Sequence, residues 1–162
     1  MAPDCSPDCH GENLRDADLS GADLTGVFLN GADLTNTNLT DADLTGVFLN
    51  GANLTGAKLN GAKLNGANLT AATLNGANLR DANLTDANLT DATLTGANLS
   101  RANLSRATLS RANLNGANLR DADLTFAYKD DDEDPLGAAV TDADLRGADL
   151  AGATMPDGTV HK

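Results

Sequence analysis

The chain has very few aromatic residues. Phenylalanine, tyrosine and tryptophan together make up 2% of its 162 residues, and tryptophan is absent. These are few aromatic residues for an ordinary globular core, in which each aromatic side chain buries roughly 150–250 Å². A core filled by small aliphatic side chains, repeated layer after layer, needs far fewer aromatic residues.

Basic residues and long apolar runs are also scarce. Lysine and arginine number 11 against 23 aspartates and glutamates, which gives a formal net charge of −12. This balance argues against direct binding to nucleic acid or to an anionic membrane, because both are negatively charged. No window of about 18 apolar residues predicts a transmembrane helix, and residues 1–4 show no signal-peptide pattern. We therefore expect a cytoplasmic protein.

The few residues that could bind a metal gather near the N-terminus, where Cys5, Cys9 and His10 lie close together. In the cytoplasm we expect reduced cysteines without a ligand. A metal site made by these three residues is an alternative, although it lacks an obvious fourth ligand. A disulfide between Cys5 and Cys9 is another. We expect no cofactor.

What the sequence has in abundance is leucine at a fixed spacing. From Leu14 to Leu124 a leucine occurs at every fifth position, usually with alanine two residues before it and Asp, Asn or Thr between them. Residues two apart in an extended backbone point to the same side, so alanine and leucine face inward. The two residues after each leucine favour turns. The pattern predicts three-residue strands joined by corners, which wind into a solenoid.

A slower period of twenty residues indicates how many strands make one turn. The sequence Gly-Val-Phe-Leu-Asn of residues 26–30 recurs unchanged at residues 46–50. Four pentapeptides per turn would also bring opposite charges together about 4.8 Å apart along the axis. The charged pairs are Asp81 with Arg101, Asp86 with Arg106, and Asp91 with Arg111.

These repeats resemble those of the pentapeptide-repeat proteins, and they cover residues 12–155 with one interruption. The resemblance implies an all-β fold, a right-handed quadrilateral β-helix. At four pentapeptides per coil, the repeats of this chain fill about seven coils with a length of roughly 34 Å. So long a run is specific for the fold. It is not specific for function, because many members of the family have none assigned.

Two terminal segments flank the predicted solenoid of residues 12–155. Residues 1–11 form an N-terminal cap, in which Ser6-Pro7-Asp8 followed by Gly11 predicts a short helical turn that covers the first strand edge. Residues 156–162 form a C-terminal tail, which begins with the turn sequence Pro-Asp-Gly.

The interruption is an acidic loop at residues 130–137, which contains five acidic residues in a row. These carboxylates repel one another, so we expect an exposed protrusion, and their spacing does not match a calcium-binding EF-hand. If Lys129 takes the leucine position before the loop and Val140 the next one after it, Arg120 and Arg146 stack on one side of the solenoid.

Aromatic residues are the strongest candidates for a contact surface. Phe28 and Phe48 occupy outward positions where neighbouring units have Asp, Asn, Lys or Thr, and Tyr128 falls in the same column. Exposed rings in contact are unusual on so polar a surface. Either the N-terminal segment folds over them, or they form an interaction patch for a protein partner or a second copy of the chain.

No set of residues predicts catalysis. His10 and His161 lie at opposite ends of the chain, and the aspartates line an open surface without a cleft that could shift their pKa. We therefore expect a non-enzymatic structural or protein-interaction module with no small-molecule substrate.

The alternative function is an acidic DNA mimic. The resemblance implies this, because some pentapeptide-repeat proteins are acidic, rod-like dimers that bind DNA gyrase and inhibit it or protect it from quinolones. This chain is similarly acidic, but leucine takes its inward positions where that group often has phenylalanine, and residues 156–162 do not predict the C-terminal helix of that group. A DNA duplex of about 34 Å also carries about 20 phosphate charges, more than the net charge of −12.

Overall fold

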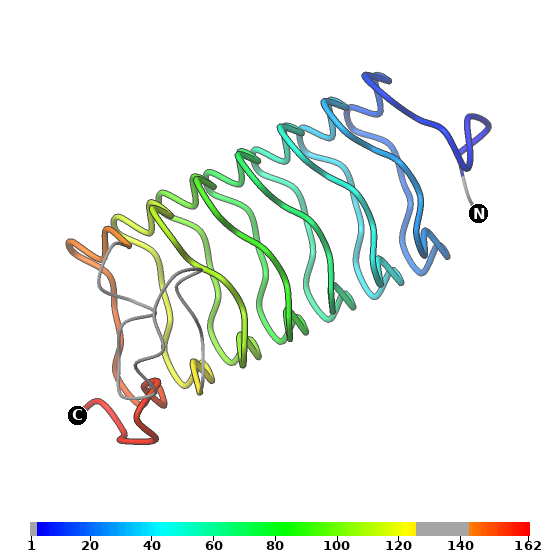
Figure 1. Cartoon of the computed structure of the whole chain (residues 1–162). Coiled ribbons are helices and arrows are strands. Elements are labelled where there is room, and N and C mark those ends of the chain that lie inside the picture. Colours follow the sequence, from blue (N-terminus) through cyan, green and yellow to red (C-terminus); the bar gives the residue numbers. More distant parts are fainter. Residues whose placement is uncertain (1–2, 126–142) are drawn as a thin grey trace.

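The computed structural model shows a rod, with the two ends of the chain at opposite ends of it (Figure 1). The structure describes residues 3–125 and 143–162. Within these ranges there is no helix, hence none that could cross a membrane, and no continuous strand. Each pentapeptide instead contributes a single residue to a β-bridge. The fold is a β-solenoid made of turns and isolated bridges.

Parallel bridges join residues twenty positions apart, for example Asn53 with Thr73. Two backbone hydrogen bonds flank this bridge: Leu54 N donates to Thr73 O at 2.7 Å, and Thr73 N donates to Ala52 O at 2.9 Å. Leu54 and Leu74 therefore occupy equivalent positions in successive turns. The twenty-residue period predicted from the sequence is confirmed.

Each corner is a tight backbone turn. The carbonyl of Leu19, for example, accepts a hydrogen bond from Ala22 N at 3.1 Å. The residue just before the alanine has a positive φ, which is 62° at Gly21 and 55° at Arg111. Glycine adopts this conformation readily, whereas other residues lose roughly 1–2 kcal/mol there. The requirement explains why glycine is common at the end of each pentapeptide.

Where Asp or Asn precedes a leucine, its side chain stabilises the corner that follows. Asn53 Oδ1 accepts hydrogen bonds from the backbone N–H of Thr55 at 3.1 Å and from its hydroxyl at 2.7 Å. Asp33 and Asp43 bind the threonines two residues after them in the same way. This bonding explains why Asp or Asn precedes the leucine and Thr often follows it.

The core is a stack of leucine and alanine layers along the axis of the rod. Every leucine from Leu24 to Leu124 is at most 1% exposed, as is nearly every alanine that faces it. Thr37 takes one alanine position, and its buried hydroxyl donates to Leu14 O at 2.7 Å. Because each layer packs mainly on its two neighbours, small side chains suffice to fill this core.

The solenoid begins earlier than we predicted. Asp8 bridges to Phe28, and Cys9 N donates to Phe28 O at 2.8 Å. Cys9 lies five residues before Leu14, occupies a leucine position and is fully buried. The predicted helical turn over residues 6–11 is absent, because Asp8 and Cys9 are already extended in the first bridge.

The register after residue 142 also differs from the prediction. Asn113 bridges to Asp144, so Leu145 stacks on Leu114 rather than on Leu119. The step from Leu114 to Leu145 is 31 residues, against the twenty of an ordinary turn. The insertion is therefore longer than the six residues that we assumed. The acidic loop at 130–137, Lys129 and Val140 lie outside the described residues.

This register separates two arginines that we expected to stack. Arg120 pairs with Asp149 at 3.2 Å. Arg146 Nε donates to Asp144 Oδ1 at 2.8 Å, and the hydrogen bonds from Arg146 lower the pKa of Asp144 to about 2. The predicted basic spot of Arg120 and Arg146 is wrong, because each arginine lies beside an aspartate instead.

The last residues fold into a hairpin on the final turn. The predicted turn at residues 156–158 brings Val160 into an antiparallel bridge with Thr154. Gly152 N then donates to His161 O at 2.8 Å. The hairpin occupies backbone groups at an edge that could otherwise pair with another chain.

Candidate interaction surface

Phe28 and Phe48 form a stacked, exposed pair, which we call the aromatic patch. Their ring centroids are 4.9 Å apart with an interplanar angle of 16°. The two side chains are 39% and 38% exposed, and among the described residues only Val160 is a further large hydrophobic residue at the surface. The predicted contact between the two rings is present, whereas Tyr128 lies outside the described residues.

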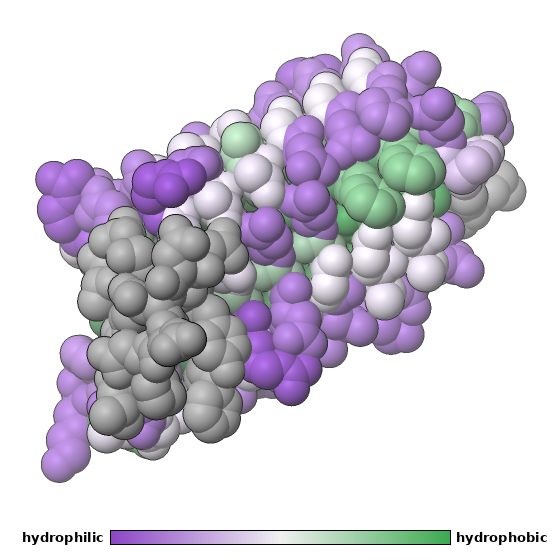
Figure 2. Space-filling model, in the orientation of Figure 1, coloured by the Kyte–Doolittle hydropathy of each residue, from purple (hydrophilic) through white to green (hydrophobic). Residues whose placement is uncertain are grey.

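Glycines leave open space on both sides of the aromatic patch. A Cβ atom added at any of four corner glycines would meet no atom within 4 Å. These are Gly26, Gly31, Gly46 and Gly51. These four corner positions therefore place no side chain beside the rings. Figure 2 shows the resulting apolar surface near the N-terminal end of the rod, among mostly polar residues.

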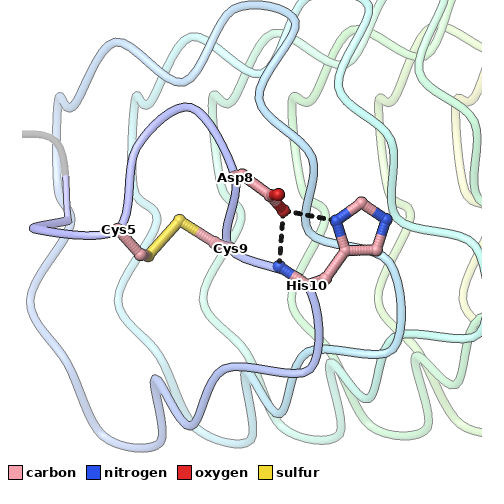
Figure 3. Close-up of a disulfide and its surroundings, with 4 residues drawn as sticks. All are labelled: Cys5, Asp8, Cys9 and His10. Atoms are coloured by element: carbon pink, nitrogen blue, oxygen red, sulfur yellow. Dashed lines mark hydrogen bonds and ion pairs between the residues drawn. A yellow bond between two sulfur atoms is a disulfide. The ribbon is translucent and has the colours of Figure 1, made fainter.

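His10 extends the column of rings towards the N-terminus. Its ring stacks on Phe28 with centroids 5.9 Å apart. His10 Nδ1 lies 2.5 Å from Asp8 Oδ1 (Figure 3), and its Nε2 lies 2.9 Å from Asn30 Nδ2. The hydrogen bond with His10 lowers the pKa of Asp8. The N-terminal segment therefore contacts one end of the aromatic patch but leaves both of its rings exposed.

Cys5 and Cys9 are joined by a disulfide (Figure 3), which corrects the expectation of reduced cysteines. The link forms because residues 5–9 turn back and bring the two Cα atoms within 5.1 Å. Neither sulfur is then a metal ligand, and the described residues contain no group of three His, Cys, Asp or Glu placed to hold a metal. Disulfides persist mainly in oxidising compartments, so this link does not fit the cytoplasm that we expected.

Charge is distributed unevenly along the rod. Residues 1–51 contain nine acidic and one basic residue, a net charge of −8 with histidine neutral. Residues 52–125 contain five acidic and seven basic residues, a net charge of +2. The aromatic patch therefore lies in the acidic part of the solenoid.

Three carboxylates are close in register to Phe28, the ring of the aromatic patch nearer the N-terminus. Asp8 bridges to Phe28 on the same side, and Asp23 and Asp33 hold the corresponding positions in the units before and after that of Phe28. Hydrogen bonds from Thr25 and Thr35 lower the pKa of Asp23 and Asp33, respectively. These carboxylates therefore carry their negative charge at neutral pH.

The predicted ion pairs in the middle of the rod are confirmed. In each of the three predicted pairs, the arginine side chain lies against the aspartate twenty residues before it. Lys63 lies 3.1 Å from Asp43 in the same way. The arginine pairs are Arg101 with Asp81 at 2.7 Å, Arg106 with Asp86 at 2.5 Å, and Arg111 with Asp91 at 2.6 Å. These arginines therefore link successive turns of the rod.

The family model of pentapeptide repeats matches residues 13–51, 49–86 and 87–125. The chain belongs to the pentapeptide-repeat family. Among solved structures, this pentapeptide-repeat protein is similar to HetL, which is involved in heterocyst differentiation regulation in the cyanobacterium Nostoc sp. strain PCC 7120. The two share 31% identity over 95% of this chain and 83% of HetL, with a TM-score of 0.42.

Two further solved pentapeptide-repeat structures are similar to the chain. Rfr23 from the cyanobacterium Cyanothece 51142 shares 26% identity over 96% of this chain and 92% of its own, with a TM-score of 0.49. QnrB1, a plasmid-mediated fluoroquinolone resistance protein, shares 19% identity over 88% of each chain, with a TM-score of 0.41. No curated protein matches the chain.

Pentapeptide-repeat proteins are generally structural or interaction proteins, and the surface of this member agrees with that role. The contact between His10 and Asp8 joins the kinds of side chain that general acid–base catalysis uses. Both side chains are more than half exposed, and they lie beside Phe28 on the outside of the rod. On the described surface, Phe28 and Phe48 of the aromatic patch are two of the three exposed large hydrophobic residues.

Proposed function

We propose that this pentapeptide-repeat protein is a non-enzymatic interaction module that binds a protein partner through its aromatic patch. The observation that carries the proposal is the exposure of Phe28 and Phe48, at 39% and 38%, on a polar surface. Contact with a partner would remove this apolar area from water, which favours binding. The open corners beside the rings leave room for the partner to approach.

We propose that the solenoid is a rigid support for the aromatic patch. We take the solenoid to be right-handed and quadrilateral, with about seven coils, as the resemblance to the family implies. The recurrence of bridges every twenty residues, with four bridging positions in each turn, supports this geometry. Such a rod would hold both rings in a fixed position, so little conformational entropy would be lost when a partner binds.

An interface made only of the aromatic patch, such as a homodimer held by these rings alone, is disfavoured by its small area. Phe28 and Phe48 are 39% and 38% exposed, and at roughly 200 Å² for each side chain their exposed area is about 150 Å². A stable interface buries about 800 Å² on each partner. The rings would therefore serve as an anchor within a larger contact, which must include polar residues around them.

The charge distribution does not favour a DNA mimic. Mimicry needs negative charge along the whole rod, yet residues 52–125 carry a net charge of +2. The direct check is a gyrase supercoiling assay with micromolar protein, with and without a quinolone. We expect no change in supercoiling.

Photo-crosslinking can test the proposed docking surface. Benzoylphenylalanine replaces Phe48 in one variant and Asn88, two turns further along the same column, in a matched control. In extracts of cells that make the protein, we expect a defined crosslinked product from position 48 alone. The additional change Phe28→Asn should abolish it. No product, or the same product from both positions, would contradict the proposal, and a product of twice the chain mass would identify a homodimer.

A further inference from the structure

We infer that the partner presents a cationic segment, with an apolar side chain on the aromatic patch and lysine or arginine over the nearby carboxylates. This inference rests on the proposed function and adds the chemistry of the partner. Its basis is that the exposed rings and the unbalanced negative charge occur in the same part of the rod. Residues 1–51 hold both rings of the patch and a net charge of −8.

Two carboxylates beside the aromatic patch can receive the cations. Asp8 is next to Phe28 in the column, and its side chain is 73% exposed. Asp23 belongs to the preceding unit, and Gly26 forms the corner between it and Phe28. Within the described residues, no lysine or arginine lies within ion-pair distance of either carboxylate. Among the described residues, Asp23 has no ion-pair partner and Asp8 has only His10, which it contacts through Oδ1. The carboxylate of Asp23 and the Oδ2 atom of Asp8 can therefore still receive a cation from a partner.

Two other carboxylates in this region already have a basic neighbour. Asp33 lies 3.1 Å from Arg15, and Asp43 lies 3.1 Å from Lys63. Of the carboxylates next in register to Phe28, Asp8 and Asp23 therefore remain without a lysine or arginine partner. Further along the same column the outward residues are Asn68, Asn88 and Thr108, which carry neither charge nor an aromatic ring.

The same charges argue against two other occupants. A second copy of the chain would bring its own region of net charge −8 against the first. The acidic loop at residues 130–137 would also be repelled, because five of its eight residues are acidic. A cationic, partly apolar segment of another protein is complementary to both the charge and the rings.

The test uses two short fluorescein-labelled peptides of equal length, one of alternating leucine and lysine and one of alternating leucine and glutamate. Binding to the full chain is measured by fluorescence anisotropy at low and at high salt. We expect the lysine peptide to bind, the glutamate peptide not to bind, and added salt to weaken binding, since exposed charges are screened. Equal binding of both peptides, or no binding of either, would overturn the inference.

Variants separate the contributions of the rings and the charges. Phe28→Asn with Phe48→Asn reproduces the asparagines found further along the column, and should weaken binding of the lysine peptide about tenfold or more. Asp8→Asn with Asp23→Asn keeps the side-chain oxygens that accept hydrogen bonds, and should weaken it roughly three- to tenfold. Asp123→Asn, at an equivalent position far from the patch, should leave binding unchanged. Thermal melts confirm that each variant folds.

The outcomes distinguish this inference from the proposal on which it rests. If position 48 crosslinks to a partner but the Asp8 and Asp23 changes leave peptide binding unaltered, the docking surface stands and its cationic partner is refuted. If the charge changes weaken binding but the ring changes do not, the peptide binds by charge alone and the inference is wrong. If position 48 forms no crosslink in the chain that retains Phe28, the proposed function itself is refuted.

Discussion

Replacing one central leucine tests how the solenoid is held together. Leu64 is fully buried, and its column neighbours Leu44 and Leu84 are fully buried as well. Hydrogen bonds from Leu64 N to Asn83 O at 2.7 Å and from Lys63 N to Ala42 O at 3.0 Å fix the backbone on both sides. Leu64→Ala should therefore leave a cavity that the wall does not close, and the expected loss is about 3–5 kcal/mol, in the upper part of the range for such changes.

Urea and thermal unfolding followed by circular dichroism measure this loss. For a chain of this size, about 3–5 kcal/mol lowers the melting temperature by roughly 10 °C or more. Leu145→Ala is the matched control, because Leu145 lies near the end of the rod and is only partly buried. It should lose less than about 2 kcal/mol. A loss below about 1 kcal/mol at Leu64, or equal losses at both sites, would refute the layered-core reasoning.

Three further predictions concern the corners and the surface carboxylates. Ala71 has a φ of 56°, so Ala71→Gly should stabilise the fold by about 0.5–1 kcal/mol in urea titrations, while Ala67→Gly, at an inward position, should destabilise it. Asn53→Ala removes the acceptor for Thr55 and should lose about 1 kcal/mol, whereas Asn53→Asp should be nearly neutral. Carboxylates with a lowered pKa, such as Asp144 at about 2, stabilise the folded state above their unfolded pKa of roughly 4 and lose that contribution as the pH falls towards 2. A melting temperature that stays constant below about pH 4 would contradict this.

The repeating part of the fold was predictable because the same residues recur at the same spacing. Both the twenty-residue period and the pairing of Asp81 with Arg101 follow from that recurrence, and both are present in the structure. The hydrogen bonds that Thr55 donates to Asn53 were not predicted, although such bonds recur in many of the repeats. An outward position alone does not reveal which group its side chain binds.

Prediction was weaker where the repeat changes its residues. Cys9 lies five residues before Leu14, so the spacing was a sign of a leucine position, but cysteine does not match the repeat and the residue was assigned to the cap. A contact between the N-terminal segment and the rings was one of the two alternatives, and His10 makes it by stacking on Phe28. The step from Leu114 to Leu145 was misjudged because Val140 fits the repeat spacing and was taken as the first leucine position after the loop. In the structure it is Leu145 that stacks on Leu114.

The twenty-residue turn has a consequence for how such a rod can lengthen during evolution. A duplication of twenty residues adds one turn and returns every later residue to its original side, whereas a duplication of five moves all later columns on by one side. The bridge between Asn113 and Asp144 shows that the columns also continue across an irregular insertion. Rod length downstream of Phe48 can therefore vary between relatives by whole turns, while the aromatic patch keeps its distance from the N-terminal disulfide.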